Sequence, residues 1–188
     1  MLKPAGFIFD LEGTIEAAAF LLKKYEGRKQ GHGVLLKLLY IADRKSVNES
    51  GRPITGCTWM AFHHGPSLEE PLRYSHNQVS PDLPDYDKNR LKKWQQNFDV
   101  EGTGKNRTLH LVNDPGVRHL SKFERRILTE VFEEFGNMNF SQLRKVTHEF
   151  PEWKKHFPKE GQKRPITLQD LLDGLEVEDH DEVERNAL

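Results

Sequence analysis

Apolar positions are densest along residues 34–66, and the first half of this stretch has the spacing of a helix. Four residues follow the i, i+3, i+4, i+7 pattern of one buried face: Leu35, Leu38, Leu39 and Ala42. Apolar residues at positions 34, 36 and 41 widen this face until it almost encircles the helix, which is typical of a helix in the middle of a domain. The Gly-Arg-Pro sequence at 51–53 breaks the pattern. A central buried helix is therefore predicted to begin near residue 34 and to end before residue 51.

Strand patterns occur in three places. Residues 54–62 form a β-rich run that Gly65-Pro66 stops, and both of its faces carry apolar side chains. Residues 98–101 and 107–112 read as two further strands joined by a hairpin loop at 102–106. We expect these runs to make one small antiparallel sheet of about three strands.

Further helices are expected around the central one, over residues 15–25, 67–76, 121–135, 142–150 and 165–175. Their predicted N-terminal caps are Asp10, Ser67, Ser121 with Glu124 as a capping box, and Thr167. Residues 79–86 and 154–164 are expected to be loops, and residues 88–96 are compatible with a short helix or an extended segment. The predicted fold class is α+β and predominantly helical, with the helices packed around a central buried helix beside a small antiparallel sheet.

Composition narrows the function classes. The chain has 188 residues with 36% hydrophobic and 30% charged residues, enough for one domain and a small appendage. A net charge of -1 and the lack of a basic recognition helix argue against nucleic-acid binding and against a membrane-surface role. The single cysteine, Cys57, cannot form an intrachain disulfide, and neither a signal peptide nor an apolar stretch of membrane-spanning length is visible. We expect a cytoplasmic protein.

One short motif raises the alternative of an enzyme. Residues 7–14 read Phe-Ile-Phe-Asp-Leu-Glu-Gly-Thr and resemble the opening motif of haloacid-dehalogenase-type phosphatases. The resemblance would make Asp10 the nucleophile and Glu12 the general acid beside Mg²⁺. However, Glu is one methylene longer than the usual acid, and the later strands and paired acids of that family are missing. A helix cap at Asp10 is the favoured interpretation.

Metal and phosphate sites lack support in the sequence. His63 and His64 are adjacent, so in a strand they would point to opposite faces, and no Cys or His stands at a paired ligand spacing. The glycines and Lys105 in residues 102–106 do not follow the phosphate-loop pattern, and no helix comes directly after them. We therefore expect no metal, no cofactor and no catalytic residue.

The order and spacing of several blocks resemble the Panacea domain, the SocA-like antitoxin family of bacteria and phages, which includes phage-associated GepA-like proteins. The similarity extends from about residue 9 to about residue 153. It rests on four blocks: Phe9-Asp10 before an alanine-rich helix; Lys37-Leu38-Leu39-Tyr40-Ile41-Ala42-Asp43-Arg44; Gly51-Arg52-Pro53-Ile54-Thr55-Gly56 leading to Trp59-Met60-Ala61 and Gly65-Pro66; and Leu120-Ser121 with Glu124, then Ser141, Leu143, Thr147-His148-Glu149 and Trp153.

The resemblance implies a non-enzymatic antitoxin that neutralises a cognate toxin by direct protein–protein binding. An alternative role in the family is that of an adaptor that delivers its toxin to a Clp protease. The paired toxins are varied, so the partner is not specified by the chain. We expect residues 1–157 to form the Panacea domain, and residues 158–188 to form an extension with a short helix and a disordered acidic tail.

The resemblance also marks residues with expected roles. The family-signature residues are interpreted as structural: Lys37, Tyr40, Asp43, Arg44, Gly51, Thr55, Trp59, Gly65, Pro66, His148 and Trp153. The toxin-binding surface is expected on residues 88–96, residues 154–164 and the acidic tail. The candidate contact residues there are basic: Lys88, Arg90, Lys93, Lys154, Lys155 and Lys159.

Overall fold

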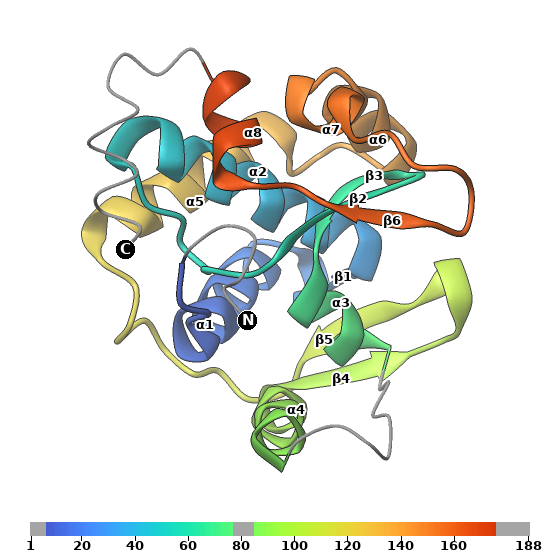
Figure 1. Cartoon of the computed structure of the whole chain (residues 1–188). Helices are drawn as coiled ribbons and strands as arrows, with labels where there is room; N and C mark the ends of the chain where they lie inside the picture. Colours follow the sequence, from blue (N-terminus) through green and yellow to red (C-terminus); the bar gives the residue numbers. More distant parts are fainter. Residues whose placement is uncertain (1–6, 77–84, 176–188) are drawn as a thin grey trace.

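A computed structural model of the chain describes residues 7–76 and 85–175 (Figure 1). The α-helices are α1 (Leu11–Leu22), α2 (His32–Ser50), α3 (Glu69–Ser75), α4 (Asp85–Asn97), α5 (Lys122–Phe135), α6 (Phe140–His148), α7 (Pro151–Lys155) and α8 (Leu168–Asp173). Two short 3-10 helices are η1 (Glu26–Arg28) and η2 (Gly104–Asn106). The strands are β1 (Lys29–Gly31), β2 (Trp59–Phe62), β3 (Gly65–Leu68), β4 (Phe98–Glu101), β5 (Thr108–Leu111) and β6 (Lys163–Pro165). The predicted α+β, mainly helical class is confirmed.

Helix α2 is the centre of the core. It packs against α1, α5, α6 and strand β3, and Figure 1 shows it passing through the middle of the molecule. Leu35 and Leu38 on this helix are 0% exposed. The helix ends at Gly51, whose φ of 72° is the left-handed conformation that a glycine adopts without strain at a helix C-terminus. The central buried helix predicted from the apolar pattern is therefore confirmed.

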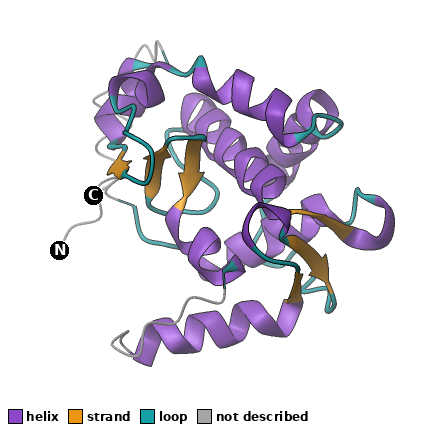
Figure 2. Cartoon of the chain, turned by 90° about the vertical axis from the view of Figure 1, so that its right-hand side faces the viewer, coloured by secondary structure: helices purple, strands orange, loops and turns teal. Residues whose placement is uncertain are grey.

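Within residues 7–76 and 85–175, the strands form two separate antiparallel sheets, ordered β1-β5-β4 and β3-β2-β6; Figure 2 draws the strands in orange. The expectation that β2 shares one sheet with the hairpin was wrong. The hairpin β4–β5 pairs with β1, whereas β2 pairs with β3 and β6. The chain turns back at His63-His64, so β3 lies where the sequence pattern placed the start of a helix.

The predicted helix caps were mostly correct. The Asp10 carboxylate accepts a hydrogen bond of 2.9 Å from the backbone N–H of Gly13. Ser121 and Thr167 each cap their helix in a capping box. Ser67 was wrong as a cap, because it lies within β3 and the helix begins two residues later without a side-chain cap.

The segment after α7 packs against the elements that precede it in the chain. The predicted loop 154–164 instead contains the end of α7 and the start of β6, which pairs with β2. The Ile166 N–H donates to the Trp59 carbonyl at 2.9 Å, and α8 packs on α7 with Leu171 and Leu172 fully buried. Residues 88–96, which the sequence left open, are helical within α4. The predicted acidic tail lies outside the described residues.

Among residues 7–76 and 85–175, the structure has no helix with the length and apolar character needed to cross a membrane.

Candidate functional site: a basic groove beside helix α2

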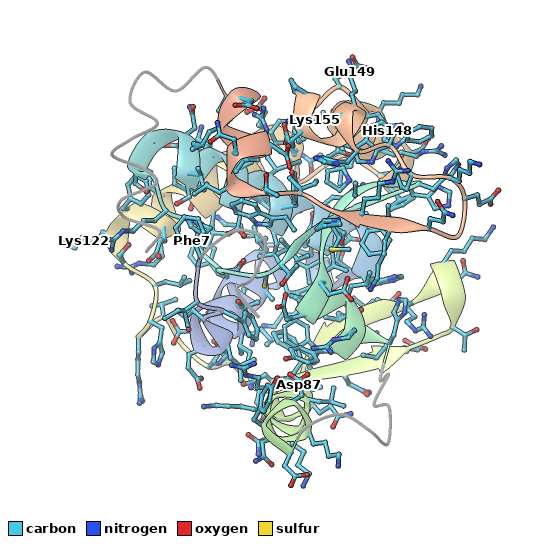
Figure 3. All side chains as sticks on the ribbon, viewed as in Figure 1. Phe7, Asp87, Lys122, His148, Glu149 and Lys155 are labelled. Carbon is cyan, nitrogen blue, oxygen red and sulfur yellow. The ribbon has the colours of Figure 1, made fainter. Side chains whose placement is uncertain are left out.

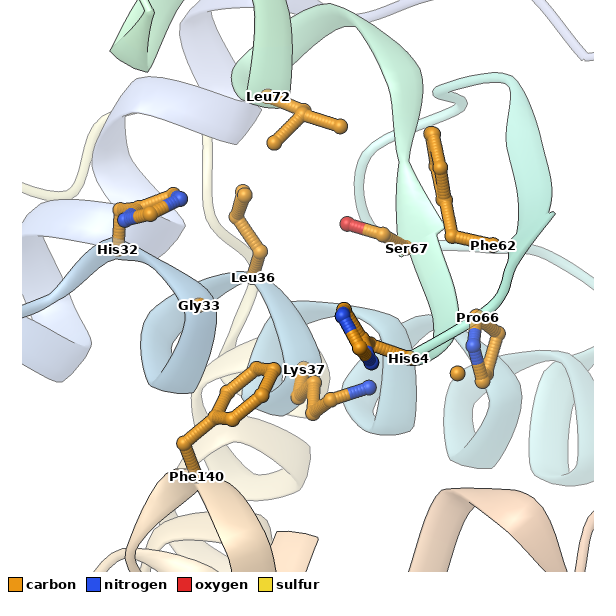
Figure 4. Close-up of a pocket in the computed structure, with 11 residues that line it drawn as sticks. His32, Gly33, Leu36, Lys37, Phe62, His64, Pro66, Ser67, Leu72 and Phe140 are labelled. Atoms are coloured by element: carbon orange, nitrogen blue, oxygen red, sulfur yellow. The ribbon is translucent and has the colours of Figure 1, made fainter. Parts of the chain in front are cut away.

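A groove lies along the N-terminal half of α2 (Figure 4). It consists of a deep hollow of about 180 Å³ that adjoins a wider one of about 690 Å³. Its walls come from α2, the β2–β3 turn, the end of α3, η2 with Arg107, and the start of α6. Five residues line both hollows: His32, Gly33, His64, Leu72 and Phe140. We call the two hollows together the basic groove.

Lys37 lies in the deep hollow. Its side chain is buried with only 4% of the residue exposed, and its Nζ donates to the Thr147 hydroxyl at 3.2 Å. The Nζ also lies 5.5 Å from the centre of the Phe140 ring. No carboxylate of the described chain pairs with it. Burial, reinforced by the Arg144 guanidinium, lowers the pKa of Lys37 to about 7.

Gly65 explains how the β2–β3 turn closes over this lysine. Its φ is +106°, a conformation that L side chains rarely adopt. A Cβ at this position would collide with the Lys37 Nζ and would lie 2.7 Å from the Thr147 Oγ1. A glycine is therefore required for the turn to pack directly on the ammonium group.

Two histidines form the wall near the start of α2. The Nδ1 of His32 lies 3.1 Å from the Arg107 carbonyl, so Nδ1 carries the proton in a tautomer assigned from this contact. The Nε2 atoms of His32 and His76 are 3.5 Å apart. Burial, followed by the positive charge of Arg107, lowers the pKa of His76 to about 4, so this imidazole is neutral near pH 7.

These histidines do not make a metal site with a third ligand. No group of three or more His, Cys, Asp or Glu side chains that could hold a metal ion occurs within residues 7–76 and 85–175.

The charge in the groove is of one sign. Lys105, Arg107 and Arg144 line the wide hollow, and no ion pair joins them to a carboxylate in the part of the chain that the structure describes. No Asp or Glu is among the described residues that line either hollow. Burial, followed by the charge of Arg144, lowers the pKa of His64; Glu160, which does not line the groove, opposes this shift. Apolar walls with unpaired cations suit a ligand that is partly apolar and negatively charged.

A row of aromatic rings leads from this groove to α7; we call it the aromatic ridge. Successive ring centres are 3.8 to 6.4 Å apart along the series Trp153–His148, Trp153–Phe157, Phe157–His63, His63–His64 and His64–Phe140. Phe140 is 40% exposed and Phe157 is 50% exposed, so the ridge presents apolar surface to solvent.

The chain matches the family model described as "Antitoxin SocA-like, Panacea domain" over residues 35–154, which is more than half of its 188 residues. This chain belongs to the SocA-like antitoxin family. The match includes α2 from Leu35 onward, the aromatic ridge up to Trp153 and most of the basic groove. No curated protein and no solved structure gives a significant match.

Several of the residues expected to be structural make buried contacts in the core. The Asp43 carboxylate is fully buried and accepts hydrogen bonds from the N–H groups of Ile54 and Thr55, both at 2.9 Å. It also accepts from the Thr55 hydroxyl at 2.5 Å and from the Trp59 indole at 3.1 Å. Burial outweighs these bonds and raises the pKa of Asp43 to about 6. Asp43 thus fixes the segment between α2 and β2.

Tyr40 and Arg44 meet a carboxylate that the sequence pattern did not single out. The Tyr40 hydroxyl donates to Glu152 at 3.1 Å, and the Arg44 Nε donates to the same oxygen at 2.9 Å. Arg44 also reaches the carbonyl of Gly174 at 3.0 Å and stacks over Phe150. The network ties α2 to α7 and to the end of α8.

The remaining signature residues are divided between core and site. Gly51 ends α2, and Pro66 lies opposite Ala61 in the β2–β3 pair. The Trp153 indole donates to the Phe62 carbonyl at 2.8 Å, while its ring stacks on His148 in the aromatic ridge. Lys37, Gly65 and Pro66 line the basic groove.

None of the six basic residues proposed from sequence lines the basic groove. Three lie on α4 and three on α7 or just after it; Figure 3 labels Asp87 of α4 and Lys155 of α7 at opposite ends of the view. On α4, cations pair with carboxylates in three contacts: Lys88 with Asp85, Arg90 with Asp87, and Lys93 with Glu12. On α7, the contacts are Lys154 with Glu149 and Lys155 with Asp170 and Asp173. Lys159 is exposed. Their role in toxin binding stays a prediction.

Asp10 and Glu12, the two residues of the phosphatase alternative, make structural contacts. Asp10 caps α1, and residues 7–9 before it form no strand in the structure. The Glu12 carboxylate pairs with Lys93 of α4. The strand-borne nucleophile that the short motif would require is therefore not formed at this position.

Sequence reasoning missed most of the groove. His32, His76, Arg107, Phe140 and Arg144 come from four separate regions of the chain, and no local pattern connects them. The available signal was a lysine at position 37 within the otherwise apolar run of residues 34–42. A charged lysine buried by its apolar neighbours needs a compensating group, either from its own chain or from a ligand.

Proposed function

We propose that the protein is an antitoxin that neutralises a cognate toxin by binding it directly. Membership of the SocA-like family supports an antitoxin role in general. The observation that carries the proposed mode of action is the continuous surface made by the basic groove and the aromatic ridge. One part of this surface is concave, and its cations have no carboxylate partner within the described residues. The other part carries the exposed side chains of Phe140 and Phe157.

Such a surface has the composition of a protein-binding site. Large aromatic residues and arginine contribute most of the binding energy in typical interfaces, especially beside a pocket that excludes water. Phe140 lies at the junction of both parts, because it lines the groove and is in the ridge. A partner that covers it would bury apolar surface and reach the cations at the same time.

The test is a rescue experiment in cells with the product of the adjacent gene as the presumed toxin. Co-expression of this chain should restore growth, and the two proteins should co-purify as a complex. The double variant Phe140→Ala, Phe157→Ala should weaken the complex at least tenfold and abolish rescue, while Tyr86→Ala, an exposed aromatic on α4, should change neither. Toxin abundance should stay constant during rescue, which separates binding from delivery to a Clp protease. Rescue without any complex would contradict the proposal.

A further inference from the structure

We propose that the basic groove binds an acidic segment of the toxin, with one of its carboxylates seated beside Lys37 and a second acid at Arg144. This inference rests on the proposed function, since it names the chemistry of the partner surface that an antitoxin of this kind would cover. Three independent features of the groove support it.

The first feature is the unpaired charge on Lys37. Buried charged groups in proteins are normally paired, because removing an isolated charge from water is costly. Glu152, another buried ionic group of this chain, has such a partner, since it accepts from Arg44 as well as from Tyr40. Lys37 has only the Thr147 hydroxyl and the face of Phe140. The deep hollow at its side is where a carboxylate from another chain would complete the pair.

The second feature is the start of α2, which opens into the same space. Gly31, His32, Gly33 and Val34 line the wide hollow, and no side chain caps this 19-residue helix. The His32 N–H donates to the Arg107 carbonyl, but the positive end of the helix dipole still favours an anion near this terminus. Lys37 lies about one turn further along the same helix, so the two sources of positive potential add.

The third feature is the shape of the groove and its apolar walls. A hollow of about 180 Å³ is below the roughly 300–1,000 Å³ of typical small-molecule sites, so it suits one side chain. The wide hollow continues from it between Leu72 and Phe140 toward Arg144 and Arg107. A peptide with acidic and apolar side chains would use both the charges and the walls, and could continue over the aromatic ridge. A free phosphate would use the charges alone.

The protonation of Lys37 gives the interaction a characteristic pH dependence. The groups that face its ammonium are Thr147, Arg144, His148, His64 and the Phe140 ring. Burial, then Arg144, lowers the pKa of His148 to about 4, so the neighbouring imidazole stays neutral above pH 6. A bound carboxylate would raise the Lys37 pKa from about 7, so binding takes up a proton. Affinity should therefore be highest below pH 7 and fall as the pH rises.

The experiment measures binding of the adjacent gene's product to the purified full chain by calorimetry between pH 6 and 9. Lys37→Met and Arg144→Gln should each weaken binding at least tenfold, and Lys37→Met should also remove most of the pH dependence. Lys145→Gln is the matched control for Arg144, since Lys145 is exposed on the same helix and does not line the groove; it should bind within about twofold of the wild type. Thermal unfolding of every variant checks that the fold is retained.

Overlapping peptides that cover the whole toxin identify the bound segment. Peptides rich in Asp and Glu should compete for the complex, and replacing their acids by Asn and Gln should abolish competition. Inorganic phosphate and ATP test whether the groove binds a small anion instead of an acidic segment. If the wild type binds the toxin but Lys37→Met and Arg144→Gln bind equally well, the groove inference is wrong and the proposed function stands. If only phosphate or ATP binds in a Lys37-dependent manner, the acidic segment is wrong. If the wild type binds no toxin, the proposed function itself fails.

Discussion

Asp43 is a single residue that gathers several hydrogen bonds in the buried core. Its two oxygens accept four hydrogen bonds, two from backbone N–H groups and two from Thr55 and Trp59 side chains. Because every donor is buried, any change at Asp43 leaves N–H or O–H groups without an acceptor and without water. An aspartate can also cap a helix or bind a metal. At position 43 the buried donors around the carboxylate give it a structural role instead.

Asp43→Asn should therefore destabilise the protein by about 2–3 kcal/mol, because the amide has one acceptor oxygen and presents its NH₂ group to donors. Urea unfolding followed by circular dichroism measures the loss. Asp99→Asn, on the exposed side of β4, is the control and should change stability by less than about 0.5 kcal/mol. Equal stability of the two variants would show that the Asp43 hydrogen bonds are not important for the fold.

Lys37 makes the opposite contribution to stability, and the size of that contribution depends on pH. In the folded state its pKa is about 7, whereas an unfolded lysine titrates near 10.4. Between these values the unfolded chain binds more protons, so stability rises with pH. Burying the charged lysine is fully unfavourable below pH 7, and this cost disappears as the pH rises toward 10.

Lys37→Met should accordingly stabilise the free protein most at pH 6, and its advantage over the wild type should shrink by about 2–3 kcal/mol by pH 9. Urea denaturation at three pH values measures the difference. Lys145→Met, which replaces an exposed lysine on α6, is the control and should change stability by less than about 0.5 kcal/mol. A constant Lys37→Met effect across the range would mean that the ammonium is solvated in the folded state.

At the scale of elements, the segment after α7 shows how strongly β6 and α8 are built into the fold. Strand β6 pairs with β2 at Met60, Ala61 and Phe62, and α8 packs against α7. Arg44 on α2 also donates to the Gly174 carbonyl at the end of α8. The boundary at residue 157 expected from the family resemblance therefore falls between elements that share hydrogen bonds and core contacts.

A chain that ends at residue 157 should be much less stable than one that ends at residue 175. It would lose the buried side chains of Ile166, Leu171 and Leu172 and expose the surfaces they cover. Each such side chain contributes about 1.5–3 kcal/mol, so we expect a midpoint of thermal unfolding at least about 10 °C lower. Calorimetry of both chains measures it, and equal midpoints would instead support an independent domain that ends at 157.

At the scale of the whole molecule, the candidate site exists only because distant segments converge. The start of α2, the β2–β3 turn, the end of α3, η2 with Arg107, and α6 each contribute part of the basic groove. The two basic surfaces expected from sequence carry cations that mostly have carboxylate partners within the chain. The groove differs because its cations lack such partners, which is why we place the toxin contact there.

The sequence by itself determined the local features of this protein. It specified the central buried helix, the caps at Asp10, Ser121 and Thr167, the mainly helical class and the family. These depend on periodicity and on contacts within a few residues, which a linear pattern records.

Only the tertiary structure decided the strand partners, the burial of Lys37 without a carboxylate and the assembly of the basic groove. Strand pairing depends on which exposed edges meet, and β2 meets β6 about a hundred residues later in the chain. The charge state of Lys37 likewise depends on which groups from α6 and the β2–β3 turn exclude water around it. Such interactions act through space rather than along the sequence, so no local pattern encodes them.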